Sequence, residues 1–278
     1  MAEKKRMPVV RGAGMLLRRY FDHRVARDSA ALTYYLLFAI FPLLVFFSNL
    51  VGIFAVDLRA ALHELSAIIP IDVVELIEQY LVDISAQSSR TMLSFSLVFS
   101  IYFPMRAVSQ LFLSMRKAYG MGRPKHVLRH WVKVLLYTLC LLLALVLNLL
   151  LATVGDRILR FVSEYIYLSE TFITLWNTLR FVLLGLIAFI VLAALYAFLQ
   201  EDRHIIFHVW PGVLFSLAAW LALSLLFSLY VENVGRYSVL YGSIATIIVL
   251  LLWLNLTATA LIMGAEFNAV YRELQEGH

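Results

Sequence analysis

Long apolar segments recur along the chain, separated by shorter stretches rich in charged and polar residues. Each segment is about 20 residues long, which is the length that an α-helix needs to cross the hydrocarbon core of a bilayer. The pattern predicts an all-α, polytopic membrane protein with a single transmembrane domain over residues 1–278. Its six predicted spans cover residues 31–55, 93–115, 131–154, 175–199, 207–231 and 243–266.

Two other segments have an apolar face but are too polar to span a membrane. In the basic segment 1–29, one helical face carries apolar residues and lacks most of the arginines; its residues are Leu16, Leu17, Tyr20, Phe21 and Val25. This pattern is typical of a helix that lies on an anionic membrane surface. In the acidic segment 57–91, apolar residues recur at helical spacing after Pro70. We expect short amphipathic helices there, outside the membrane, either on the outer interface or over a cavity.

The composition agrees with a membrane environment. Hydrophobic residues make up 62% of the chain, charged residues make up 15%, and the mean hydropathy is +0.85. Soluble domains are about 45–50% apolar and about 25% charged, so this chain carries more apolar surface than a water-solvated core could bury. The first apolar segment begins too late and is too long for a cleaved signal peptide, so we expect it to be a retained span.

The distribution of lysine and arginine predicts the orientation. Sixteen of the 23 basic residues fall in the N-terminal tail and in the segments that alternate to the same side, and five fall on the other side. Because basic loops stay in the cytoplasm, both termini are expected there. The net charge of +5 is therefore a topology signal, and we expect no nucleic-acid partner.

The second span contains a proline and an arginine, Pro104 and Arg106. Arg106 lies about nine residues, or roughly 13 Å at helical rise, from the cytoplasmic end of its span, so we expect it to face the bundle interior or water. Pro104 leaves a backbone carbonyl free and favours a kink. Both a substrate-binding role and a structural pairing role remain open for Arg106.

Polar residues also follow one face of the sixth span. They are Asn255, Thr259 and Glu266, with Gly264 and Asn268 near the predicted cytoplasmic end. A polar face of this kind indicates either a cavity wall or a packed polar seam. The carboxylate of Glu266 is expected to pair with an arginine, and Arg106 and Arg116 are the candidates.

Further residues complete the candidate site. Tyr34 on the first span is expected to line the same cavity as Arg106. The residues that favour kinks or gating are Pro42, Pro104, Pro211, Gly242 and Gly264. Those that are expected to form the outer rim of the cavity are Glu232, Asn233 and Tyr237.

The sequence contains no recognisable catalytic or metal-binding motif. His126 and His130, like His204 and His208, stand four residues apart, but neither pair belongs to an HExxH motif. Cys140 is the single cysteine, which excludes an intrachain disulfide and a cysteine-based zinc site. There is also no P-loop, dinucleotide fingerprint or nucleophile elbow. We expect no cofactor, no metal and no enzyme activity.

The stretches SAALTYYLLFAIFPLL and YGSIATIIVLLLWLNLTATALIMGAEFNAVY resemble the YihY/BrkB family of bacterial inner-membrane proteins. The matching residues are Ala30, Ala31, Tyr34, Pro42, Pro211, Gly212, Tyr241, Gly242, Trp253, Gly264, Glu266 and Asn268. The resemblance implies six spans with both ends in the cytoplasm, as the charges also predict. Arg116 departs from the family, which favours an asparagine near that position. Members carry an old ribonuclease BN label, but a metallo-β-lactamase-type nuclease needs a motif such as HxHxDH, which this chain lacks.

These observations predict a transporter or a lipid-handling protein for an anionic amphipathic substrate. Arg106 would attract the anionic head group, and Glu266 would pair with it or gate it. The alternative is a membrane scaffold of an envelope complex, in which the polar residues only pack helices together. The expected partners are membrane lipids, anionic ones especially, and either further copies of the chain or envelope proteins.

Overall fold

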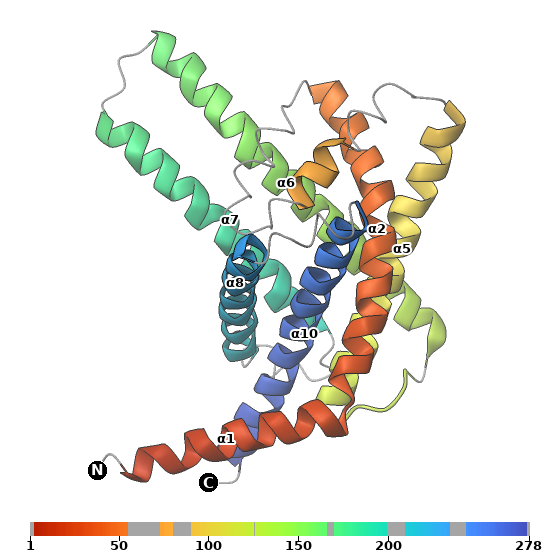
Figure 1. Cartoon of the computed structure of the whole chain (residues 1–278), viewed down its shortest axis with the longest axis vertical. Helices are drawn as coiled ribbons and strands as arrows, with labels where there is room; N and C mark the ends of the chain where they lie inside the picture. Colours follow the sequence, from red (N-terminus) through yellow and green to blue (C-terminus); the bar gives the residue numbers. More distant parts are fainter. Residues whose placement is uncertain are drawn as a thin grey trace.

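The computed structural model describes residues 3–54, 73–79, 90–124, 126–165, 170–198, 209–233 and 243–276. All regular secondary structure within these ranges is helical, which confirms the all-α prediction for the part of the chain that is described. The helices are α1 (Glu3–Asp22), α2 (Val25–Phe54), α5 (Arg90–Ala118), α6 (Val127–Tyr165), α7 (Glu170–Phe198), α8 (Trp210–Asn233) and α10 (Ser243–Glu276), and a short helix covers 73–79 (Figure 1).

Four helices are long and apolar enough to cross a membrane over their described residues. These stretches are Val25–Phe46 in α2, Val127–Asn148 in α6, Trp210–Val231 in α8 and Ala245–Gln275 in α10. They overlap four of the six predicted spans, with bounds that differ by up to nine residues. The other two predicted spans, 93–115 and 175–199, fall mainly within the helices α5 and α7. That these two helices also cross the membrane stays a prediction.

The main core lies between the beginnings of α2, α6 and α8, the ends of α5 and α7, and the second half of α10. Helix α10 packs against both α8 and α2, and α2 in turn packs along α5. Large side chains such as Phe112, Met115, Leu195 and Ile262 are fully or almost fully buried in this core. The arrangement makes α10 the central helix of the bundle, so polar groups on its sides meet several neighbours.

Helices α6 and α7 form a hairpin at the edge of the bundle. Helix α6 packs against α5, and α7 packs against α8, while the far ends of both lean away from α2 (Figure 1). Leu128, Leu136 and Leu143 on α6 are exposed. Exposed leucines along a helix of spanning length are expected to face lipid, which agrees with the predicted membrane environment.

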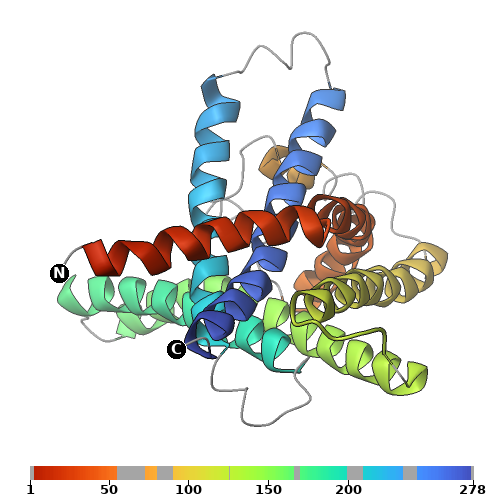
Figure 2. The same ribbon diagram turned by 90° about the horizontal axis from the view of Figure 1, so that it is seen from below.

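Helix α1 lies across one end of the bundle, where α2 begins and α10 ends (Figures 1 and 2). We call this the basal end. The chain turns sharply from α1 into α2 at Arg24, which has a φ of 55°. Leu17 and Phe21 are exposed on α1, as expected for the predicted amphipathic helix of segment 1–29. Other residues of α1 point into the bundle instead, and these form the site described below.

The short helix 73–79 confirms a helical part within the predicted segment 57–91. Its residues Val73 and Val74 are buried and pack with Leu250 and Leu254 of α10 and with apolar residues of α2. This helix is therefore part of the bundle packing. Residues 57–72 and 80–89, which make up most of the segment, lie outside the described residues.

The three prolines predicted to favour kinks or gating occupy two kinds of position. Pro42 and Pro104 lie inside α2 and α5, and both helices continue past them. Pro211 is the second residue of α8, where a missing N–H is tolerated because the first turn has no intrahelical acceptor for it. Pro211 therefore marks the start of a helix. Gly242, predicted as a gating residue, lies outside the described residues.

Candidate functional site

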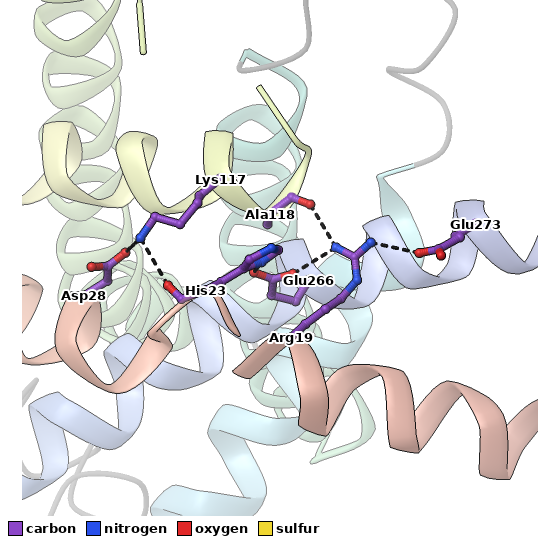
Figure 3. A network of polar contacts seen from close by, with 7 residues as sticks. All are labelled: Arg19, His23, Asp28, Lys117, Ala118, Glu266 and Glu273. Atoms are coloured by element: carbon purple, nitrogen blue, oxygen red, sulfur yellow. Dashed lines mark hydrogen bonds and ion pairs between the residues drawn. The ribbon is translucent and has the colours of Figure 1, made fainter. Parts of the chain in front are cut away.

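Charged side chains from four helices meet at the basal end (Figure 3). They come from α1, the first turn of α2, the last turn of α5 and the last part of α10. We call this group the basal cluster, and its members are Arg19, His23, Asp28, Lys117, Glu266 and Glu273.

Glu266 on α10 is the buried centre of the basal cluster, with an exposed fraction of 0%. Its Oε1 lies 2.6 Å from Nδ1 of His23, and its Oε2 accepts a hydrogen bond from Nη1 of Arg19 at 3.2 Å. A carboxylate without such partners would be strongly disfavoured at this depth. Arg19 lies in the last turn of α1 and His23 directly follows that helix, with its N–H bonded to the carbonyl of Arg19, so the two side chains reach Glu266 together.

Arg19 connects three helices through one guanidinium group. Besides Glu266, it binds the carboxylate of Glu273 at 2.8 Å and donates to the carbonyl of Ala118 at 3.1 Å. Ala118 is the last residue of α5, where the helix dipole places negative charge and favours a cation. Arg19 therefore fixes α1 to the ends of both α5 and α10.

Lys117 joins the end of α5 to the beginning of α2. Its ammonium group donates to Oδ2 of Asp28 and to the carbonyl of His23, the latter at 3.1 Å. Asp28 is buried, lies in the first turn of α2 and also contacts Arg27. A carboxylate in that position is stabilised both by the helix dipole and by its ion pairs.

A pocket with a volume of about 270 Å³ lies beside the basal cluster. Four of its nine lining residues are basic, and one is acidic. The lining residues are Arg19, His23, Lys117, Ala118, Tyr119, Gly120, Ala269, Arg272 and Glu273. We call this space the basal pocket. It is far larger than a single buried water needs, and its lining favours a polar occupant that carries negative charge.

The sequence correctly indicated that Glu266 pairs with an arginine, but the partners are Arg19 of α1 and His23 in the turn after α1. Arg106, one of the two candidates, instead donates from Nη2 to the hydroxyl of Tyr35 at 2.9 Å. Its guanidinium carbon also lies 5.2 Å from the centre of the Tyr35 ring, within the range of a cation–π contact. The other candidate, Arg116, donates to the carbonyl of Gly122.

Tyr34 lies next to this pair without joining it. Its side chain is 55% exposed, and its ring packs edge-on against Tyr35. The predicted cavity residue Tyr34 is therefore on the outer surface of the described bundle. Tyr35 holds Arg106, although the sequence analysis did not select Tyr35 as a site residue.

Asn268 on α10 bonds to the start of α8. Its side-chain oxygen accepts from the N–H of Gly212 at 2.6 Å, and its amide nitrogen donates to the carbonyl of Val209 at 3.0 Å. The same nitrogen lies 3.3 Å from the hydroxyl of Tyr119 on the basal side. Asn268 thus satisfies the N–H of Gly212 in the first turn of α8, and it adds a second bond to the carbonyl of Val209, which also accepts from the N–H of Val213.

Two glycines next to Asn268 allow α8 and α10 to approach closely. A Cβ atom at Gly264 would collide with the hydroxyl groups of Ser216 and Tyr196, and one at Gly212 would collide with the carbonyl of Gly264. The Tyr196 hydroxyl lies 2.6 Å from Ser216 Oγ, and it donates to the carbonyl of Leu261 at 2.8 Å. Gly264, predicted as a gating residue, sits at this packed polar seam.

Asn255 bonds to α2, and Thr259 bonds within α10. The amide nitrogen of Asn255 lies 3.4 Å from the hydroxyl of Thr33 on α2, and Thr259 donates to the carbonyl of Asn255 within α10. Both side chains are half-buried. Their observed bonds are those of helix packing, and their predicted contact with a substrate stays a prediction.

The predicted outer rim falls beyond what the structure describes. Glu232 and Asn233 end α8, but their side chains are not among the described ones, and Tyr237 lies outside the described residues. Within the described ranges, no group of three or more His, Cys, Asp and Glu side chains is placed to hold a metal ion.

Comparison with known proteins assigns the chain to a family. A sequence model of the family described as "Virulence factor BrkB" matches residues 16–278. The "Putative ribonuclease-like protein YfkH" of Bacillus subtilis (strain 168) is 28% identical over 255 residues, which is 92% of this chain and 93% of that protein.

Two shorter similarities are to proteins named "UPF0761 membrane protein". The one from Albidiferax ferrireducens is 34% identical over 86 residues, covering 31% of this chain and 21% of that protein. The one from Histophilus somni (strain 2336) is 27% identical over 85 residues, covering 31% of this chain and 30% of that protein. No solved structure matches the chain. Because the family match extends over nearly the whole sequence, the chain belongs to the BrkB family, also called YihY/BrkB, of membrane proteins.

Proposed function

We propose that this chain is a transporter or lipid-handling protein that takes an anionic amphipathic substrate at its basal end. The observation that carries the proposal is the basal pocket, a space of about 270 Å³ with basic residues from α1, α5 and α10 in its lining. A lining that combines guanidinium and ammonium groups suits a phosphate or a carboxylate. The pocket lies beside an amphipathic helix, where the head groups of a bilayer would be.

We infer that all six predicted segments cross the bacterial inner membrane and that the basal end faces the cytoplasm. The basic residues of α1 and those that follow α5, such as Arg123, lie at or near that end. Such enrichment marks the cytoplasmic side. With this orientation, the exposed Leu17 and Phe21 of α1 would enter the cytoplasmic leaflet, while Arg19 and His23 stay on the bundle.

We also propose that the chain is not an enzyme. The Bacillus relative is named "ribonuclease-like", but a metal-dependent nuclease needs a cluster of metal ligands at defined spacing. The present sequence has no HxHxDH motif. The charged residues of the basal cluster are engaged in ion pairs that join helices, a structural use that requires no reaction.

Lipid transfer between the leaflets of a vesicle tests the proposal. The purified chain would be reconstituted in vesicles that contain a trace of labelled phosphatidylglycerol or phosphatidylcholine, with the fluorescent label far from the head group. A quencher added outside the vesicles would measure how fast labelled lipid reaches the outer leaflet. We expect faster transfer of the anionic lipid than in protein-free vesicles, and slower transfer for Lys117→Gln. Arg18→Gln is the matched control, because Arg18 is an exposed residue of α1 outside the pocket. Transfer equal to that in protein-free vesicles would contradict the proposal.

The second candidate function is a membrane scaffold without transport. It is favoured by the α8–α10 seam, in which Asn268, Ser216 and Tyr196 bond to protein groups. A scaffold needs these bonds but no movement of lipid. In the vesicle experiment it would give a folded, stable chain with no transfer of either lipid, and Lys117→Gln would behave like the parent.

A further inference from the structure

We infer that the basal pocket is a phosphate-binding site in which Arg19, Lys117 and Arg272 contact the phosphate and Glu273 competes with it. The inference deepens the proposed function and rests on it for the anionic character of the ligand. It goes further by naming the chemical group, the three cations and a competing carboxylate of the same chain. The phosphate could belong to a lipid head group or to a soluble ion, since the recognising chemistry is the same.

The three cations come from three different helices. Arg19 is on α1, Lys117 is in the last turn of α5, and Arg272 is on α10, and all three line one space. Their positions on separate elements allow them to approach a single anion from different sides. Guanidinium groups match the geometry of phosphate oxygens through paired N–H donors, and an ammonium group adds a compact charge.

Two of these cations are already oriented by buried acids. Glu266 and the carbonyl of Ala118 hold Nη1 of Arg19, while Asp28 and the carbonyl of His23 hold the Lys117 ammonium. The side chains nonetheless keep exposed fractions of 24% for Arg19 and 37% for Lys117. A ligand would therefore meet charged groups that need little reordering, which favours binding.

Glu273 is the acid that a phosphate would displace. It binds Nη2 of Arg19 at 2.8 Å, lines the pocket and is 55% exposed, whereas Glu266 is buried beneath the same arginine. An exposed carboxylate can turn toward water at little cost, since surface ion pairs are weak. In the unliganded state Glu273 would neutralise Arg19, and on binding the phosphate would take its place on Nη2.

Binding of phosphate to the full-length chain tests this inference directly. Titration calorimetry in detergent micelles would use inorganic phosphate, and microscale thermophoresis would use phosphatidylcholine nanodiscs with and without phosphatidic acid. Lys117→Gln and Arg272→Gln are each expected to weaken binding roughly tenfold, the amount that one charge-assisted hydrogen bond contributes. Glu273→Gln is expected to tighten binding by several-fold, because it removes the competitor. Arg18→Gln on the exposed side of α1 should leave binding unchanged.

The gain expected from Glu273→Gln makes the test robust, because misfolding cannot strengthen binding. Binding of phosphatidic acid alone would support the site and identify a lipid source, and binding of inorganic phosphate as well would support it with a soluble source. Absence of binding to both probes, or weaker binding by Glu273→Gln, would overturn the inference. Phosphate binding without lipid transfer in vesicles would support the phosphate site and contradict the proposed function. Lipid transfer without phosphate binding would contradict the phosphate site alone.

Discussion

At the residue scale, the basal cluster shows how a membrane-protein helix carries an acid at a buried position. Glu266 has no exposed surface, yet both of its oxygens have nitrogen partners, one on α1 and one in the turn that follows α1. These partners stand 247 and 243 positions away in the sequence. Because the unpaired carboxylate would be costly, its presence ties the position of α1 to that of α10.

Replacing Glu266 by alanine should destabilise the protein. We expect a loss of about 3 kcal/mol, the lower end for a broken buried ion pair, because Arg19 keeps partial exposure and its bond to Glu273. Denaturant or thermal unfolding in detergent measures the change. Asp22→Ala is the control, since it removes an exposed carboxylate paired with Arg18 and should change stability by less than about 0.5 kcal/mol. Equal stability of the two variants would contradict a stabilising role for Glu266.

Some of these residues could be predicted from the sequence, and others could not. Glu266 stood out because an acid in an apolar run is expensive, and its need for a cation followed from the same physics. In the sequence, nothing distinguishes Arg19 and Lys117 from the other basic residues on the predicted cytoplasmic side. Their contacts depend on how α1 packs across the end of the bundle. The spacing of Arg19 and His23 by four residues was the available local signal.

At the element scale, the close approach of α8 and α10 depends on small residues. Gly212 and Gly264 let the two backbones meet, and Ser216 of α8 donates to the carbonyl of Ala260 on α10. Tyr196 of α7 bonds to both Ser216 and the carbonyl of Leu261 on α10. Small residues are the usual means by which helices pack closely where no hydrophobic effect drives them together. The sequence placed these glycines on the right helices, but only the structure shows that they face each other.

Gly264→Ala should therefore disrupt the seam. The added Cβ would collide with the hydroxyls of Ser216 and Tyr196, and such overpacking costs about 1–3 kcal/mol. A lower midpoint of thermal unfolding in detergent is the expected result. Gly185→Ala on α7 provides the matched control, because nothing lies within 4 Å of a Cβ built there. If both alanine variants unfold at the parent temperature, the seam is looser than described.

The helices were predictable from the sequence to the extent that their signals are local. The length of the apolar segments predicted the long helices. The helical spacing of apolar residues in the acidic segment predicted a short amphipathic helix, and a helix is present at 73–79. The burial of Val73 and Val74 against α2 and α10 was not predictable, because it depends on contacts distant in sequence. Likewise Pro211 was predicted as a kink or gating residue, whereas it is the second residue of α8.

At the scale of the whole molecule, charge and apolar surface are segregated among the residues that the structure describes. Apolar side chains are exposed along α6 and on several other helices, while the basal end collects ion pairs and basic residues. The α6–α7 hairpin extends from the edge of the bundle, and α1 lies across its base (Figures 1 and 2). This segregation matches a chain that stands in a bilayer with its basal end in a head-group layer.

The orientation can be measured with single cysteines. In a Cys140→Ser background, Gly14→Cys on α1 and Gln275→Cys near the end of α10 place one thiol each on exposed positions of the two helices that meet at the basal end. Both thiols should resist a membrane-impermeant maleimide in intact spheroplasts and react in inverted membrane vesicles. Labelling of only one of them in spheroplasts would show that the two helix ends lie on opposite sides of the membrane.

The central claim is that an anionic amphiphile binds at the basal pocket, and cross-linking tests it most directly. Vesicles with the reconstituted chain would contain phosphatidylglycerol or phosphatidylcholine with a photoreactive group next to the head group, and adducts would be located by peptide mass spectrometry. We expect more adducts of the anionic lipid than of phosphatidylcholine at residues 19–23, 117–120 and 269–273, which include the pocket lining. Lys117→Gln should reduce this difference. The same distribution for both lipids, dominated by the exposed face of α6, would contradict the central claim.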